Sequence, residues 1–262
     1  MLRIFQTLPL AEFTAFETAD VEFAQAEIGK MYCRHTLRLS PGNRKLQARL
    51  NRAPLSDLLI NYIAYGADVE VAAEGLDQHH ILLIPTRSIL KLAYCNNEVI
   101  ADPQKGAILP MNLALTMTMK AEHDSIQLRI PSTAVEKHLS VLLGETLTAP
   151  IEFTPSVDLT RGDIGRWLRL LEYAVYNLES GEKQKSLIST IISREMRDVL
   201  LSSLLHLQPH NYSQKFATAA LPSSGSVRRA EEYIHAHAHE AMTIEKLANA
   251  SGGWHPRVAN SL

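Results

Sequence analysis

The region between Met31 and Pro131 constrains the fold most, because it consists of short alternating runs separated by turn residues. Leucine and methionine alternate with alanine and threonine over residues 113–119, and isoleucine and leucine alternate with glutamine and arginine over residues 126–130. Alternation of this kind buries one face of a strand. Many short strands with close turns predict an antiparallel β-barrel or β-sandwich.

A helical region follows the predicted strands. Residues 133–136 have the spacing of a capping box, and the helix that they begin is expected to end near Gly144. Asp163–Ser180 and Lys185–Leu207 then carry an apolar period of about 3.6 residues. These two segments predict a helical hairpin joined at Gly181.

The second helix of this hairpin has a wider apolar stripe than one facing helix needs. A dimer contact would use the extra surface, with Ile191 and Val199 as the candidate contact residues. Packing of both helices onto the β-domain is the alternative, and the pattern leaves both open. The stripe comprises Leu187, Ile188, Ile191, Ile192, Met196, Val199, Leu200 and Leu204.

Composition bounds the class of protein. A length of 262 residues fits one main domain and a smaller unit, and no window approaches the roughly 20 apolar residues of a membrane span. The net charge of -2 gives no global nucleic-acid footprint, so any DNA binding must come from a local surface. The first ten residues show no secretory signal, and Cys33 and Cys95 suit reduced thiols. We therefore expect a cytoplasmic protein without membrane contact.

A polar, turn-rich linker is expected over residues 209–226. Beyond it, Val227–Ile234 predicts one helix and Thr243–Gly252 predicts a second, with Thr243 as the N-cap and Gly252 as the last residue. Two short helices before a glycine turn are the opening of a helix-turn-helix unit.

The segment Arg229–Gly252, with the wording Met-Thr-Ile-Glu-Lys-Leu-Ala at residues 242–248, resembles the opening of the AraC/XylS-type DNA-binding domain. The upstream region resembles the AraC-binding-like sensor of the same family, especially at Tyr32–Leu37 and at the capped helix near Glu136. The first resemblance is local, whereas the second covers most of the chain.

The resemblance implies an α+β chain with four parts. They are a cupin-like antiparallel β-barrel that binds a small effector (1–160), a helical dimerisation hairpin (161–208), a linker (209–226) and an incomplete helix-turn-helix domain (227–262). It implies a homodimer that takes a small-molecule effector, and DNA as the partner of intact relatives. No cofactor and no metal ion is expected.

Two polar residues interrupt apolar strand faces and are therefore candidate effector-binding residues. His35 lies on the apolar face of a strand expected over residues 31–39, and Tyr62 lies between Ile60 and Ala64. A pocket needs few polar groups in an apolar wall. The alternative is that each is a core residue with an internal hydrogen-bond partner.

The C-terminal segment departs from the family pattern. After the Gly252 turn the family continues into a recognition helix, but this chain reads Gly-Trp-His-Pro-Arg-Val, and Pro256 opposes a helix there. Residues 227–262 hold four basic and four acidic side chains, whereas phosphate contacts need a positive face. We therefore expect DNA binding to be lost or impaired by C-terminal truncation, and no base-contacting residues are assigned.

Catalytic and metal-binding patterns are missing. His235, His237 and His239 are better explained as a solvated helix face, because only the first and the last share a face. The sequence lacks a nucleophile elbow, a phosphate loop and a Cys-x-x-Cys pair. We predict that the chain is not an enzyme; the alternatives are a small cupin-fold enzyme and a dimerisation scaffold without an effector.

Overall fold

The chain divides into two compact units, Met1–Ser213 and Gln214–Leu262. This division falls inside the predicted linker, but residues 209–213 belong to the first unit, where Pro209 accepts a backbone hydrogen bond from Thr154. The computed structural model describes residues 8–41, 45–76, 78–160, 162–180 and 187–215, together with residues 233, 234, 236, 237, 243, 246 and 249.

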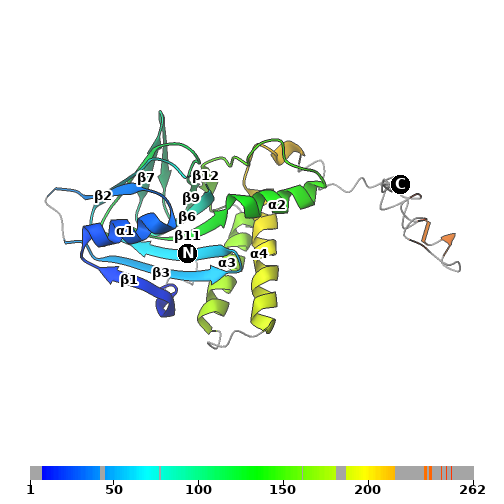
Figure 1. The fold of residues 1–262 in the computed structure, drawn as a ribbon, viewed down its shortest axis with the longest axis horizontal. Helices are drawn as coiled ribbons and strands as arrows, with labels where there is room; N and C mark the ends of the chain where they lie inside the picture. Colours follow the sequence, from blue (N-terminus) through cyan, green and yellow to red (C-terminus); the bar gives the residue numbers. More distant parts are fainter. Residues whose placement is uncertain are drawn as a thin grey trace, which may run out of the picture. The chain divides into compact units, whose positions relative to one another are not determined.

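The first unit is built on two antiparallel sheets that face each other (Figure 1). The larger sheet has seven strands, in the order β1 (Thr14–Thr18), β3 (Ala48–Leu55), β4 (Leu58–Ala64), β11 (Asp124–Pro131), β6 (His79–Arg87), β9 (Lys105–Ile108) and β12 (Ser156–Asp158). The smaller sheet has five strands, in the order β2 (His35–Leu39), β5 (Val69–Ala73), β10 (Leu115–Met119), β7 (Leu90–Tyr94) and β8 (Asn97–Ala101).

The predicted α+β class is confirmed, and the strands predicted around residues 113–119 and 126–130 are confirmed as β10 and β11. Leu115 and Met119 are buried, as their alternation requires, while β10 and β11 belong to different sheets although they are consecutive in the chain. The described strands form two separate sheets, with β1 and β12 at the edges of the larger one and β2 and β8 at the edges of the smaller one. The β-domain is therefore an open two-layer sandwich rather than a closed barrel. Its core lies between the sheets, where Leu83, Leu90 and Leu92 are almost fully buried.

A helix that the sequence analysis missed precedes the smaller sheet. Helix α1 (Val21–Met31) is capped by Asp20, whose side chain accepts hydrogen bonds from two backbone N–H groups of the first turn. A short 3₁₀ helix, Ala11–Phe13, lies before β1. The predicted strand over residues 31–39 is therefore too long: Met31 ends a helix, and β2 begins only at His35.

Helix α2 (Ser132–Leu143) follows β11 and ends at Gly144, which adopts a φ of 70°. This left-handed conformation favours glycine, so the predicted end of the helix is confirmed. The predicted capping box is wrong, because the helix begins at Ser132 and its N-cap, Pro131, offers no side-chain acceptor.

The predicted hairpin helices are confirmed as α3 (Gly162–Ser180) and α4 (Leu187–Leu207), which lie side by side below the larger sheet in Figure 1. The buried indole of Trp167 donates a hydrogen bond to the carbonyl oxygen of Leu200 over 3.0 Å. The predicted joint at Gly181 lies outside the described residues. None of the described helices combines the length and the apolar composition of a membrane span.

The second unit is described at few positions. The backbone N–H of Lys246 donates to the hydroxyl oxygen of Thr243 over 3.3 Å, so the predicted N-cap is confirmed. The rings of Tyr233 and His237 stack with centroids 4.2 Å apart. His235, His239 and the segment after Gly252 lie outside the described residues, and the expectations placed on them stay predictions.

Candidate functional site

A cavity lies between the two sheets and is closed on one side by the C-terminal end of α1. It encloses about 50 Å³ that the centre of a water molecule can reach, which is room for a few waters or a small ligand. Its wall is mainly apolar with few polar side chains, as in most small-molecule sites. The lining residues are Ile28, Tyr32, Cys33, His35, Ile63, Tyr65, Val71, Ala73, Leu76, Ile81, Leu109, Leu115, Met117 and Gln127.

His35 is the most distinctive polar group of this wall. Its side chain is buried, with 7% exposed, and its Nδ1 lies 3.1 Å from the carbonyl oxygen of Cys33. The other ring nitrogen, Nε2, is buried without a hydrogen-bond partner. Burial lowers the pKa of His35 more than the Cys33 carbonyl raises it. A neutral imidazole therefore brings an unused polar atom to the edge of an apolar cavity.

A hydrogen-bonded group occupies the larger-sheet side of the cavity. The Tyr32 hydroxyl donates to Oε1 of Gln127 over 2.8 Å and accepts from Nδ2 of Asn61 over 2.6 Å. Burial is the main cause that raises the pKa of both Tyr32 and Tyr65, so both phenols are neutral at physiological pH. These contacts hold Tyr32 and Gln127 in fixed orientations on the cavity wall.

Of the two predicted site residues, the structure brings only His35 to this cavity. Tyr62 lies on the opposite face of β4 from Ile63, which is one of the lining residues. The Tyr62 hydroxyl donates to Oδ2 of Asp124 over 2.8 Å, and Thr86 donates to the other oxygen of the same carboxylate. Tyr62 is thus held in the core by an internal partner.

Tyr62 was wrongly expected to face the cavity because β4 is buried on both faces over most of its length. Apolar neighbours along such a strand do not reveal which face meets the cavity. The same effect hid Gln127, whose position in the alternation of β11 suggested a solvent-facing side chain. Tyr32 and Tyr65 carried no separate signal, because the first lies in the connection after α1 and the second follows the end of β4.

Among the described residues, three other histidines are buried and do not line the cavity: His80, His123 and His210. His80 and His123 are each 3% exposed, and burial lowers the pKa of each to about 4. The His80 ring meets the ring of Phe153 edge-on, with centroids 5.2 Å apart. Within the described residues no three histidine, cysteine or acidic side chains are grouped so that they could hold a metal ion.

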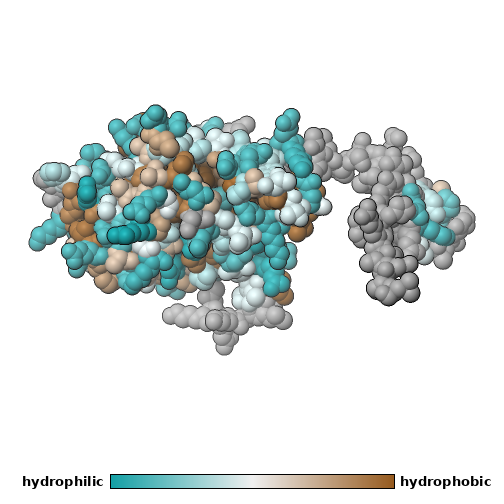
Figure 2. Space-filling view, turned by 45° about the horizontal axis from the view of Figure 1, so that its top comes forward, coloured by the Kyte–Doolittle hydropathy of each residue, from teal (hydrophilic) through white to brown (hydrophobic). Residues whose placement is uncertain are grey.

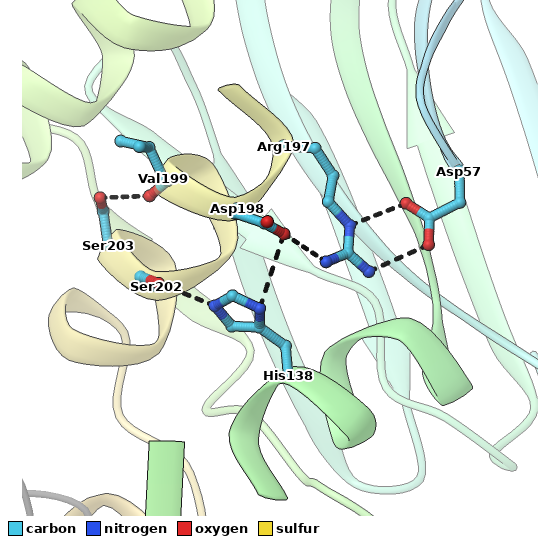
Figure 3. A network of polar contacts seen from close by, with 7 residues as sticks. All are labelled: Asp57, His138, Arg197, Asp198, Val199, Ser202 and Ser203. Atoms are coloured by element: carbon cyan, nitrogen blue, oxygen red, sulfur yellow. Dashed lines mark hydrogen bonds and ion pairs between the residues drawn. The ribbon is translucent and has the colours of Figure 1, made fainter. Parts of the chain in front are cut away.

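A second polar region joins α4 to the larger sheet (Figure 3). The guanidinium of Arg197 donates to both carboxylate oxygens of Asp57, in the turn between β3 and β4, over 2.8 and 3.0 Å. It also donates to Asp198, whose carboxylate lies 3.7 Å from Nδ1 of His138 on α2. Nε2 of His138 lies 2.7 Å from the Ser202 hydroxyl. The cluster formed by Asp57, His138, Arg197, Asp198 and Ser202, hereafter the α4 junction, therefore joins three elements.

Comparison with known proteins gives a consistent result. The family model described as AraC-binding-like domain matches residues 24–206, which is more than half of the chain. The Probable thc operon regulatory protein of Rhodococcus erythropolis is 25% identical over 236 residues, covering 89% of this chain and 70% of that protein. The crystal structure of the AraC-like transcriptional activator CuxR has a TM-score of 0.53 at 15% identity, covering 90% of this chain and 84% of its own.

The expected fold is thereby confirmed as α+β with a cupin-like antiparallel β-sandwich. The matched residues include both sheets of the sandwich apart from β1, the cavity between them and nearly all of the α3 and α4 hairpin. The chain belongs to the AraC family of transcription regulators, and its AraC-binding-like domain spans residues 24–206.

Proposed function

We propose that the cavity between the sheets is the effector site of a cytosolic transcription regulator, and that His35 contacts the effector. The observation that carries this proposal is the Nε2 atom of His35, which is buried beside the cavity without a partner. A buried polar atom without a partner costs about 1–3 kcal/mol. Because Nδ1 carries the proton that faces the Cys33 carbonyl oxygen, Nε2 is an acceptor, and a ligand hydroxyl or amide N–H that donates to it would remove that cost.

The experiment is a thermal-shift screen of the full chain against a panel of small metabolites. A compound that binds the folded state raises the melting temperature with its concentration. In a His35→Phe variant the shift should shrink by more than half, while circular dichroism shows an unchanged fold. The exposed His206 on α4 supplies the matched control, because His206→Phe removes an imidazole that does not line the cavity. A panel without any shift would favour a scaffold that has no effector.

We further propose that α3 and α4 form a homodimer contact. The apolar stripe predicted on α4 has two parts: Leu200 and Leu204 are buried, whereas Ile191 and Val199 are 51% and 46% exposed. The two outward residues are eight positions apart and lie on one side of the helix. The neighbouring helix α3 adds exposed tyrosines at positions 173 and 176. Figure 2 shows one face of the described residues, on which apolar residues form several patches separated by hydrophilic ones.

Exposed apolar residues of this size on adjacent helices are typical of an interaction surface. The packed residues hold the hairpin on the sandwich, and the exposed ones are available to a second copy of the chain. In this proposal the sandwich senses the effector and the hairpin joins two sensors. The proposal assigns no catalytic role to the chain.

A further inference from the structure

Arg129 borders the cavity, although it is not among its lining residues. On β11 it is the next side chain after Gln127 on the same face, because successive side chains of a strand alternate. Its register partner on β6 is Ile81. Both of these neighbours line the cavity. The Arg129 side chain therefore extends from a position at the rim of the cavity.

Arg129 differs from the other partly buried arginines of the described chain in having no acidic partner. Arg49 pairs with Glu17, and Arg197 pairs with Asp57 and Asp198. The described ion pairs include none for Arg129, whose single hydrogen-bond contact is a 3.4 Å approach of Nη2 to Nδ1 of His79. Its Nε atom is buried and has no partner.

Among the described residues, the charged group that acts on Arg129 is another cation, Arg52. Arg52, on the same face of the larger sheet, is the register partner of Asn61, which in turn is the register partner of Gln127. Burial lowers the pKa of Arg129, and the positive charge of Arg52 lowers it further, against the opposing effect of Tyr32. A partly desolvated cation next to a second cation lacks a counter-ion.

We propose that the effector is a small organic carboxylate whose apolar body fills the cavity and whose charged end binds Arg129, with Arg52 adding to the attraction. This inference rests on the proposed effector site. A guanidinium binds a carboxylate with two parallel hydrogen bonds, and the unpartnered Nε of Arg129 can supply one of them. The apolar wall beyond Gln127 and Ile81 suits an aliphatic or aromatic body. A phosphate carries more charge and more acceptors than this single partly buried guanidinium can satisfy.

The experiment is isothermal titration of the full chain with three acids and their matched amides: hexanoate, benzoate and phenylacetate against hexanamide, benzamide and phenylacetamide. We expect at least one acid to bind about ten-fold or more tightly than its amide, because only the acid makes a charge-assisted pair. Arg129→Met should weaken the binding of that acid by about ten-fold or more and change the affinity for its amide by less than two-fold. Arg129→Lys should retain part of the preference for the acid, because the charge stays and the fork geometry is lost.

Arg38→Met is the matched control. Arg38 is an exposed arginine of β2 that alternation directs away from the cavity, and its replacement should leave all six affinities unchanged. Equal binding of acids and amides, undiminished binding of the acid to Arg129→Met, or no binding of any of the three acids would each overturn the carboxylate assignment. The comparison of acid with amide on the unmodified chain stands even if the variants fail to fold.

The measurements distinguish failure of the carboxylate assignment from failure of the proposed effector site. Amides that bind the unmodified chain and lose affinity in His35→Phe, with Arg129→Met unchanged, would overturn the carboxylate and keep the site. A screen of neutral and charged metabolites without a single thermal shift would overturn both.

Discussion

The α4 junction and the cavity rim are both polar regions of the sensor unit, and they differ in how completely their polar groups are paired. At the junction, Arg197 meets two carboxylates and His138 meets a carboxylate and a hydroxyl. At the rim, Arg129 has no acidic partner, and Nε2 of His35 has none at all. Groups that folding satisfies serve the fold, whereas groups beside the cavity that folding leaves unsatisfied are available to a ligand.

This comparison separates stability from binding. Substitution of a paired group should change the free energy of unfolding and leave ligand binding intact. Substitution of an unpaired group at the rim should do the reverse. The predictions below test buried polar side chains of this unit and then an exposed apolar pair, in order of decreasing effect on stability.

The largest effect is expected for a buried histidine away from the cavity. Both ring nitrogens of His123 lack partners, and burial lowers its pKa from the ordinary value of 6.5 to about 4. As the pH falls, the unfolded chain takes up the proton first, so folding loses stability between pH 6.5 and pH 4 and is unaffected by this group above pH 6.5. The loss is on the order of 3 kcal/mol.

Urea unfolding at pH 7.5, 5.5 and 4.5 measures this effect. The variant His123→Leu should be at least as stable as the parent at pH 7.5, because it removes two unsatisfied buried atoms, and its stability should fall less on acidification. The exposed His206 gives the control variant His206→Leu, which removes an imidazole from α4 and leaves His123 in place. An unchanged pH dependence in His123→Leu would contradict the assignment.

Loss of the ion pairs at the α4 junction comes next. Arg197→Met keeps the aliphatic stem but leaves Asp57 and Asp198, which are 47% and 40% exposed, without their cation. Because these carboxylates reach solvent, the expected loss in the free energy of unfolding is about 1–2 kcal/mol rather than the value for a fully buried pair. Arg194→Met, at an exposed position of α4, should change it by less than about 0.5 kcal/mol. Urea denaturation of both variants provides the comparison.

Tyr62→Phe tests the residue that the sequence placed with His35. Removing the hydroxyl should cost about 1 kcal/mol, because Asp124 loses one hydrogen bond and keeps the one from Thr86. Ligand affinity measured by titration should stay within two-fold of the parent value. A marked loss of affinity with unchanged stability would return Tyr62 to the effector site.

The sequence predicts the elements whose signals are local, that is, confined to a few neighbouring residues. The strands β10 and β11, the helices α3 and α4 and the end of α2 at Gly144 are all visible in alternation, helical period or turn chemistry. Helix α1 was missed because its apolar face is short, although Asp20 carries a recognisable cap. The separation of β10 and β11 into different sheets has no local signal, because sheet membership depends on contacts distant in sequence.

The site was harder to predict than the fold for a related reason. His35 could be found because one polar residue interrupts an apolar strand face. Arg129 and Gln127 occupy the polar positions of an alternating strand, and only the second sheet converts that polar face into a cavity wall. A pattern along one strand cannot show what covers it.

The smallest effect on the stability of the single chain is expected on the exposed face of the hairpin, where the side chains are apolar rather than polar. Ile191→Glu combined with Val199→Glu places two charges at positions that are already about half exposed, so the free energy of unfolding of the monomer should change by less than about 0.5 kcal/mol for each. If these residues meet a second copy, the same charges lie in a desolvated interface, and the dimer should dissociate. Sedimentation velocity over a concentration series measures the association, and Leu204→Glu at a fully packed position of the same helix is the contrasting variant, which should unfold the hairpin instead. Retention of a dimer by the double variant would show that the exposed apolar side chains of α4 do not hold two chains together.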